Sequence, residues 1–251
     1  MWWSFANEYD LMIDRTLADW DHYFQLVQDL DPYDHLRSVH NARPFYDHGK
    51  PWVTHCSVQH HDMLQVPTWL QQYQKPVVVD ECGYEGDISR AWGSMSAEFL
   101  IESFWVGFTV GGYVGHGETY WNEEEILWWS KGGKLHGESA PRIAFLRQII
   151  EAVPEPGLFP FKNQEEIRRL FSEGATKGMA AGHNGTDYML LYCARHQPRF
   201  RNIHLPEGSY QIDIIDTWNM TINRFADTAT GTIEVELPRR QYLAVRVIRN
   251  R

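Results

Sequence analysis

Strands alternate with helices over the first 153 residues, and this alternation most narrows the folds open to the chain. Apolar runs predict strands at residues 2–6, 35–40, 52–57, 76–80 and 109–114. Apolar residues at spacings of three and four predict helices at residues 14–29, 66–74, 95–108 and 141–153. Strands that alternate with helices are typical of parallel βαβ units, so the sequence predicts an α/β domain.

The pattern changes at Pro154-Glu155-Pro156-Gly157, which predicts a break. A short charged helix is expected at residues 164–172. Strands are expected at residues 188–194, 208–216, 232–237 and 242–248, the second with apolar side chains at every other position. This predicts an all-β region the size of a small antiparallel sandwich. We therefore expect two domains, residues 1–155 and 156–251.

Charge and cysteine content exclude several classes of function. The 251 residues include 23 basic and 33 acidic side chains, a net charge of -10, which argues against nucleic acid or an anionic membrane as partner. Three scattered cysteines are neither a disulfide framework nor a zinc site and favour a cytoplasmic location. No apolar stretch reaches the ~20 residues of a membrane span. We expect no cofactor and no metal, since the adjacent histidines His60 and His61 are poorly placed to share one ion.

Two predicted strands end in a glutamate. Asn7-Glu8 follows the first strand, and Asp80-Glu81 follows three consecutive valines. Acidic residues are common where a strand ends and the chain leaves the core, so a single glutamate at such a position is weak evidence for catalysis. Two glutamates at the carboxyl ends of parallel strands lie where (β/α) barrels place their chemistry, and they provide the pair that glycoside cleavage needs.

These motifs also resemble a known group of enzymes. Residues 4–8 resemble the fourth strand, and residues 77–81 the seventh, of the large clan of retaining barrel glycosidases. Residues 111–118, rich in glycine, look like the eighth strand. Nearly the whole chain resembles a poorly characterised family of glycosyl hydrolases of the DUF4038/DUF5605 type. The resemblance implies a TIM-type (β/α) barrel with strands 4–8 present and strands 1–3 missing, followed by a C-terminal β-sandwich.

The resemblance also implies roles for particular residues. Glu8 would be the general acid/base, Glu81 the nucleophile, and Asn7 a hydrogen-bonding partner of the sugar's 2-hydroxyl. The implied activity is a retaining glycosidase acting on an oligo- or polysaccharide. For Asn7, a cap on its own backbone is the alternative.

Further candidates for substrate binding lie on the same predicted face. His55 would contact the nucleophile unless it is a satisfied core histidine, and His60 lies in the loop beyond it. His116 and Glu118 follow the last strand, as does Trp121, which is either a stacking surface for sugar or a cover of the barrel mouth. Asp80 should point away from Glu81 by strand alternation. We expect Glu85 and Asp87 to be solvated loop charges.

Because strands 1–3 of the expected barrel are missing, two interpretations of the chain stay open. The chain would be part of a longer glycosidase, or a non-catalytic carbohydrate-binding or structural remnant of such a barrel. Open sheet edges predict self-association, or pairing with a missing N-terminal half of the barrel, and little activity in isolation.

Overall fold

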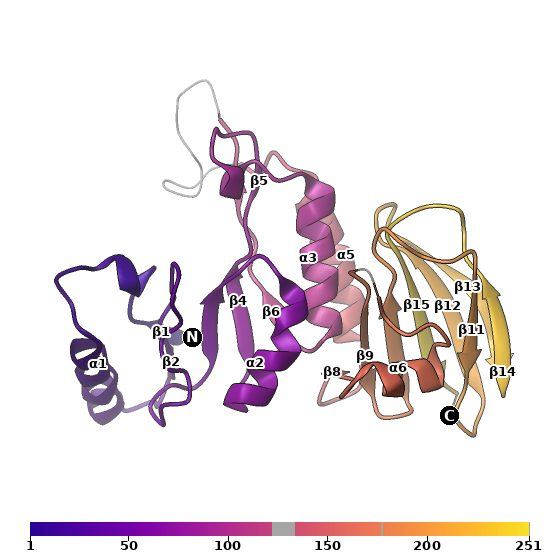
Figure 1. The fold of residues 1–251 in the computed structure, drawn as a ribbon, viewed down its shortest axis with the longest axis horizontal. Helices are drawn as coiled ribbons and strands as arrows, with labels where there is room; N and C mark the ends of the chain where they lie inside the picture. Colours follow the sequence, from indigo (N-terminus) through magenta and orange to yellow (C-terminus); the bar gives the residue numbers. More distant parts are fainter. Residues whose placement is uncertain (122–133, 177, 251) are drawn as a thin grey trace.

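The computed structural model describes residues 1–121, 134–176 and 178–250. Figure 1 shows an elongated arrangement in which the chain runs from one end to the other. The first end holds β1 (Trp2–Ser4), α1 (Leu17–Leu30) and β2 (Leu36–Ser38). Parallel strands and helices form the middle, and antiparallel strands form the other end (Figure 1).

Two small parallel sheets make up the N-terminal half. β1 pairs with β2, while β3 (Cys56–Gln59), β4 (Val77–Glu81) and β6 (Tyr113–Val114) form a sheet in the order β3-β4-β6. The sheets are joined where the Thr54 N–H donates to the Arg37 carbonyl oxygen at 2.9 Å. The predicted parallel pairing is confirmed in both sheets. The carboxyl ends of β1 and β4 therefore point toward the same side of the molecule.

The prediction of a TIM-type barrel was wrong. The described strands that were assigned to it fall into separate sheets of two and three strands, and no ladder connects β6 back to β1. Several of these strands are only two to four residues long. A closed barrel needs eight strands of matched tilt and stagger, which these short segments do not supply.

A lobe rises beyond the carboxyl ends of β4 and β6 (Figure 1). It contains β5 (Glu85–Gly86), the short helix η3 (Ala91–Gly93) and β7 (Glu118–Thr119), with β5 and β7 paired in parallel. The Thr119 hydroxyl donates to the Gly93 carbonyl oxygen at 2.7 Å, which ties the short helix to β7. This lobe forms one wall of the cavity described below.

Two helices form the central layer of the molecule. α3 (Ala97–Thr109) and α5 (Ser139–Glu151) lie between the parallel strands and the antiparallel sheet (Figure 1). α3 is buried on most of its faces because both neighbours cover it. Thr109 is the last residue of α3, and its carbonyl oxygen lies against Gly182 of the antiparallel sheet. A Cβ added at Gly182 would be 1.8 Å from that oxygen. The Trp105 ring stacks on Tyr192 of that sheet, with centroids 5.5 Å apart.

The C-terminal strands form one six-stranded antiparallel sheet and one two-stranded ribbon. The larger sheet has the order β13-β12-β15-β10-β9-β8, and the ribbon pairs β11 with β14. A second core lies between this sheet, the ribbon and α6 (Gln164–Leu170). The strands are β8 (Phe159–Pro160), β9 (Ala180–Asn184), β10 (Tyr188–Tyr192), β11 (Phe200–His204), β12 (Tyr210–Asp216), β13 (Thr221–Ala229), β14 (Thr232–Glu236) and β15 (Leu243–Arg249).

The N-terminal corner has its own small core around Trp20 and Phe24 of α1. Thr16 and Asp19 form a capping box that fixes where this helix begins. Trp2 and Trp3 of β1, an outer strand of its two-stranded sheet, remain about half exposed. The predicted self-association through such an edge stays a prediction.

The main core crosses the predicted domain boundary. It joins β3, β4, α3 and α5 to β9, β10 and β15. The division into residues 1–155 and 156–251 stays a proposal, and two such units would share one core. Among the described helices, none has the length and apolar character of a membrane span.

Candidate active site

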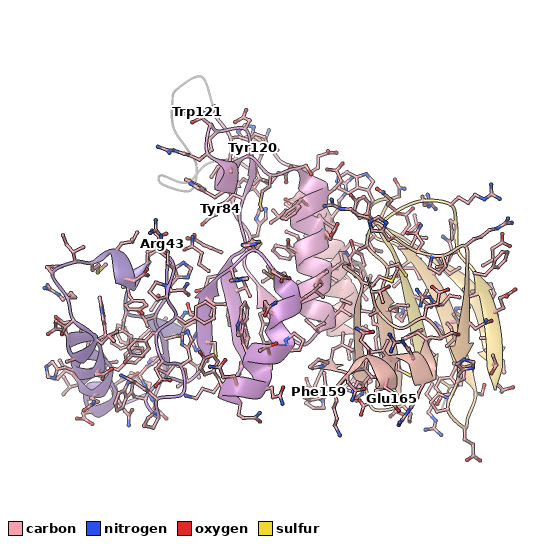
Figure 2. The ribbon with its side chains drawn as sticks, in the orientation of Figure 1. Arg43, Tyr84, Tyr120, Trp121, Phe159 and Glu165 are labelled. Carbon is pink, nitrogen blue, oxygen red and sulfur yellow. The ribbon has the colours of Figure 1, made fainter. Side chains whose placement is uncertain are left out.

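A cavity of about 1030 Å³ opens where β3 and β4 end and the lobe begins. Both Glu8 and Glu81 line it. Figure 2 shows Arg43 on the N-terminal wall and Tyr84 on the lobe that faces it. The described residues that line it are Asn7, Glu8, Ala42, Arg43, Gln59, His60, His61, Glu81, Cys82, Gly83, Tyr84, Ala91, Trp92 and Met95.

Glu8 has a strained and well-anchored backbone. It adopts the left-handed conformation, with φ 51° and ψ 55°, which costs a non-glycine residue about 1–3 kcal/mol. On either side of it, the Ala6 carbonyl accepts from the His40 N–H at 3.2 Å, and the Tyr9 N–H donates to the His40 carbonyl at 2.8 Å. These two bonds hold Glu8 against the end of β2. Strain of this kind clusters at functional sites.

Gln59, the last residue of β3, contacts the Glu8 carboxylate. With its amide oriented so that the nitrogen faces the surrounding acceptors, Gln59 donates to Glu8 Oε1 at 3.2 Å and to the Asn41 carbonyl oxygen at 2.9 Å. The buried Asn41 side chain in turn accepts from the Gln59 backbone N–H at 3.1 Å. The end of β3 is thereby fixed to the end of β2.

His40 stands between the two acidic residues that end β4. Its Nδ1 lies 3.5 Å from Asp80 Oδ2, and its Nε2 lies 3.8 Å from Glu81 Oε1. Burial alone would lower the pKa of His40, but its contacts with Asp80 and Glu81 raise the pKa above the ordinary value. The Ser57 hydroxyl also donates to Asp80 Oδ2. Asp80 therefore contacts His40 and Ser57 and does not line the cavity.

Two aromatic side chains form the wall of the lobe. Burial, followed by the charge of Glu81 and a hydrogen bond to it, raises the pKa of Tyr84 well above its ordinary value. Tyr84 packs edge-on against Trp92, with ring centroids 5.7 Å apart. Trp92 is 47% exposed, so an aromatic face is open to a ligand. Burial raises the pKa of the neighbouring Cys82 thiol to about 12, which makes it a poor nucleophile at neutral pH.

Three of the other residues predicted from sequence fall near β3 and the cavity mouth. Asn7 and His60 line the cavity. His60 stacks on His61 and lies edge-on to Trp69, and burial together with the charge of His61 lowers its pKa. His55 does not line the cavity. Its Nδ1 lies 3.0 Å from the Thr54 hydroxyl, and its ring packs edge-on against Trp2.

Glu118 and His116 also lie away from the cavity. Glu118 is fully buried and accepts from the backbone N–H groups of His136 and Gly137 at 2.8 and 2.9 Å. His116 Nε2 lies 3.2 Å from the Ser139 hydroxyl and 3.7 Å from Glu118 Oε1, and burial lowers its pKa. These contacts anchor the segment that leads into α5.

The expectation that Glu85 is a solvated charge was wrong. Glu85 is only 2% exposed. Its carboxylate accepts from the Glu138 and Ser139 N–H groups at 2.8 and 3.0 Å, and from the Tyr120 hydroxyl at 2.9 Å. Burial opposes ionisation, but these bonds lower the pKa of Glu85 below its ordinary value. These partners lie 35 to 54 residues further along the chain, which a local sequence pattern cannot reveal.

Trp121 is exposed and lies high on the lobe, beyond Tyr84 as seen from Arg43 (Figure 2). Its backbone N–H donates to Asp87 at 2.7 Å, and its side chain does not line the cavity. Sequence reasoning missed Trp92, Tyr84 and Gln59, which do line it. Tyr84 follows β4 by three residues, a signal that was available. Gln59 and Trp92 stand in segments without a distinctive pattern.

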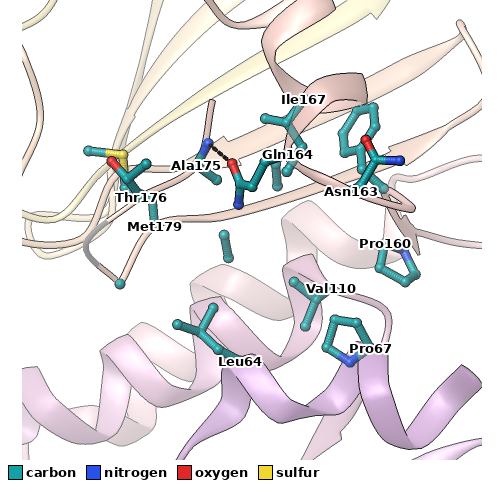
Figure 3. A pocket seen from close by; sticks show the side chains of 14 residues that line it. Leu64, Pro67, Val110, Pro160, Asn163, Gln164, Ile167, Ala175, Thr176 and Met179 are labelled. Atoms are coloured by element: carbon teal, nitrogen blue, oxygen red, sulfur yellow. Dashed lines mark hydrogen bonds between the residues drawn. The ribbon is translucent and has the colours of Figure 1, made fainter. Parts of the chain in front are cut away.

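A second cavity of about 310 Å³ lies between α2 (Val66–Tyr73), the end of α3 and α6 (Figure 3). Its walls are mostly apolar, with Pro67, Val110 and Ile167 facing it, and its polar side chains are amides and a hydroxyl. Among the described residues that line it, none carries a carboxylate or an imidazole. The carboxyl groups of Glu8 and Glu81 lie in the larger cavity. Within residues 1–121, 134–176 and 178–250, no three metal-binding side chains are grouped to hold an ion.

Comparison with known proteins points to glycoside hydrolases. A family model described as a domain of unknown function (DUF5605) matches residues 178–248. A structure from Bacteroides vulgatus ATCC 8482, described as a "putative glycoside hydrolase", is 29% identical, with a TM-score of 0.85 over 99% of this chain and 52% of its own. A search of curated proteins found no match.

Two more distant structures show the same fold. One is described as a glycoside hydrolase, with 11% identity and a TM-score of 0.72 over 93% of this chain and 61% of its own. The other is a glycoside hydrolase family 5 protein from Bacteroides vulgatus ATCC 8482, with 13% identity and a TM-score of 0.67 over 92% of this chain and 58% of its own. This chain thus spans between half and two thirds of their length, and over that length its fold is similar to that of glycoside hydrolases.

Proposed function

We propose that this chain carries the catalytic carboxylates of a glycoside hydrolase that acts with retention of configuration. The observation that carries the proposal is that Glu8 and Glu81, from the ends of two different strands, line one cavity. Retaining glycosidases use such a pair, one carboxyl as acid and then base, the other as nucleophile. The similarity to solved glycoside hydrolases supports the same reaction class.

Glu81 is the better candidate for the nucleophile. His40 and Tyr84 both approach it, and hydrogen-bond donors around a carboxylate favour the ionised form that attacks the anomeric carbon. Glu8 is then the acid that protonates the leaving oxygen and later the base that activates water. Asn7, beside Glu8 in the same lining, is proposed to bind the sugar's 2-hydroxyl.

A carbohydrate is the proposed substrate. The exposed face of Trp92 offers a surface on which a sugar ring can stack, and His60, in the same lining, offers a polar partner. Trp121, predicted for this role, lies outside the lining, so we expect its replacement by alanine to weaken sugar binding less than Trp92→Ala does. Binding isotherms of both variants with an oligosaccharide substrate test this order.

Azide rescue tests the two roles. Nitrophenyl glycosides are the substrates, and Glu165→Ala on α6, far from the cavity, is the control (Figure 2). In Glu8→Ala, azide should restore turnover and give a glycosyl azide of retained configuration. In Glu81→Ala, any azide product should be inverted. Sugar binding without turnover in the unmodified protein would instead favour a non-catalytic carbohydrate-binding module.

A further inference from the structure

Among the described residues that line the cavity, Gln59 alone contacts the Glu8 carboxylate through a side-chain amide. Its nitrogen donates to Glu8 Oε1 at 3.2 Å and lies 3.2 Å from His40 Nε2. His40 in turn reaches Glu81. A chain of polar contacts therefore runs from one carboxylate of the proposed pair to the other.

The direction of the Gln59 amide is fixed by Asn41. Two bonds join the residues: the Gln59 nitrogen donates to the Asn41 carbonyl at 2.9 Å, and the Asn41 side chain accepts from the Gln59 N–H at 3.1 Å. Asn41 is 1% exposed, so water does not compete for these groups. Asn41 takes one amide hydrogen, and the other faces Glu8 Oε1 and His40 Nε2, each 3.2 Å from the nitrogen.

We propose that Gln59 is a positioning residue for Glu8: it holds Oε1 of the carboxyl and leaves Oε2 to exchange the proton with the leaving group and then with water. This inference rests on the proposed function. A carboxyl oxygen that accepts a hydrogen bond from an amide is the less favourable place for its own proton. The proton is therefore directed to the other oxygen, and the side chain is kept in one rotamer through both half-reactions.

Kinetics test the inference through the leaving group. Gln59→Leu keeps similar bulk but removes the donor, and Gln71→Leu replaces an exposed glutamine of α2 as the matched control. We expect Gln59→Leu to lower kcat/KM by tenfold or more for substrates with poor leaving groups. Substrates whose leaving group needs no protonation should lose less than threefold, since the acid is then idle. Gln59→Asn, with a shorter amide, should not restore activity, whereas a purely structural role would reduce both substrate classes alike.

A second measurement does not depend on turnover. In NMR spectra of the folded protein, the chemical shifts of the Gln59 side-chain amide protons should change with pH, because this amide contacts the Glu8 carboxyl. Glu8 and His40 contact this amide. Other titratable groups lie around it: Glu81, Tyr84, His60 and His61 line the same cavity, Asp80 contacts His40, and Asp10 accepts from the N–H groups of Ala42 and Arg43, next to Asn41. The variant Glu8→Gln isolates the Glu8 contribution.

The outcomes separate this inference from the proposed function. An amide response that is lost in Glu8→Gln, together with the leaving-group effect, supports the positioning role. An amide that does not respond, or a Gln59→Leu variant equal to Gln71→Leu in an active enzyme, overturns it while the proposed function stands. An amide response in a protein that hydrolyses no glycoside supports the Glu8–Gln59 contact and refutes the proposed function.

Discussion

Replacement of Glu85 by glutamine should destabilise the protein strongly, although Glu85 lies outside the cavity lining. The side chain is 2% exposed and accepts from the Glu138 and Ser139 N–H groups, the Ser139 hydroxyl and the Tyr120 hydroxyl. The groups of Glu138 and Ser139 stand at the start of α5, where a negative charge is also favoured by the helix dipole. The carboxylate therefore fastens β5 to α5.

The expected magnitude follows from these four bonds. A glutamine can turn its amide nitrogen toward the Ser139 hydroxyl, which can accept, but the Ser139 N–H then loses its acceptor. One bond to a charged group is lost, at about 1.5–3 kcal/mol, and the other three weaken to neutral bonds. The free energy of unfolding should fall by about 3–5 kcal/mol, and Tm by more than about 6 °C.

Urea and thermal unfolding measure this loss. Glu151→Gln, at the other end of α5, removes an exposed pair with Arg147 and should cost at most about 0.5 kcal/mol. Because the pKa of Glu85 is lowered from 4.5 in the folded state, its stabilisation is present above pH 4.5 and is lost as pH falls through the folded value. The gap between wild type and Glu85→Gln should therefore narrow on acidification. If Glu85→Gln were as stable as Glu151→Gln at pH 7, the reasoning would be refuted.

Three further predictions concern the cavity wall and its supports. Gly117→Ala should lower glycosidase kcat/KM, because an added Cβ would lie 2.3 Å from two atoms of the Tyr84 ring and displace it; turnover and Tm measured together check this. Asp80→Asn should lower the pKa of His40, which its contacts now raise, and ¹⁵N NMR of the ring measures it. The stability that His40 contributes is complete below its unfolded pKa and lost as pH rises through the folded one, so this pH dependence should shrink in the variant. Trp92→Ala should weaken oligosaccharide binding about tenfold or more, as loss of a stacking surface predicts, and calorimetry tests it.

Some parts of the structure could be predicted because the signal is local. The three valines of β4 indicate a strand buried on both faces, and the glutamate that ends the strand lies at the cavity, as strand-end carboxylates in parallel sheets often do. The capping box of Thr16 and Asp19 is a local signal for the start of α1 at Leu17, three residues after the start expected from the apolar spacing. Such features depend on neighbours within a few residues.

Other parts depend on distant partners or on the absence of burial. β13 is exposed along most of its length, so its side chains lack the alternation that predicts a strand. β9 was missed because it begins with Ala-Ala-Gly, residues with small side chains that do not form an apolar run. Small residues are needed there because β9 packs against the end of α3. The expected barrel failed for a similar reason, since pairing between strands, unlike the existence of each strand, is decided by long-range contacts. The burial of Glu85 likewise depends on groups more than fifty residues away.

Covalent trapping tests the central claim most directly. The protein is incubated with a panel of 2-deoxy-2-fluoro glycosyl fluorides, which slow release of a glycosyl-enzyme intermediate, and is then digested for mass spectrometry. The account predicts that a sugar becomes attached to the peptide containing Glu81, that Glu81→Gln abolishes the attachment, and that Glu8→Gln only slows its release. Attachment to any other residue, or hydrolysis that proceeds with inversion and leaves no adduct, would contradict it.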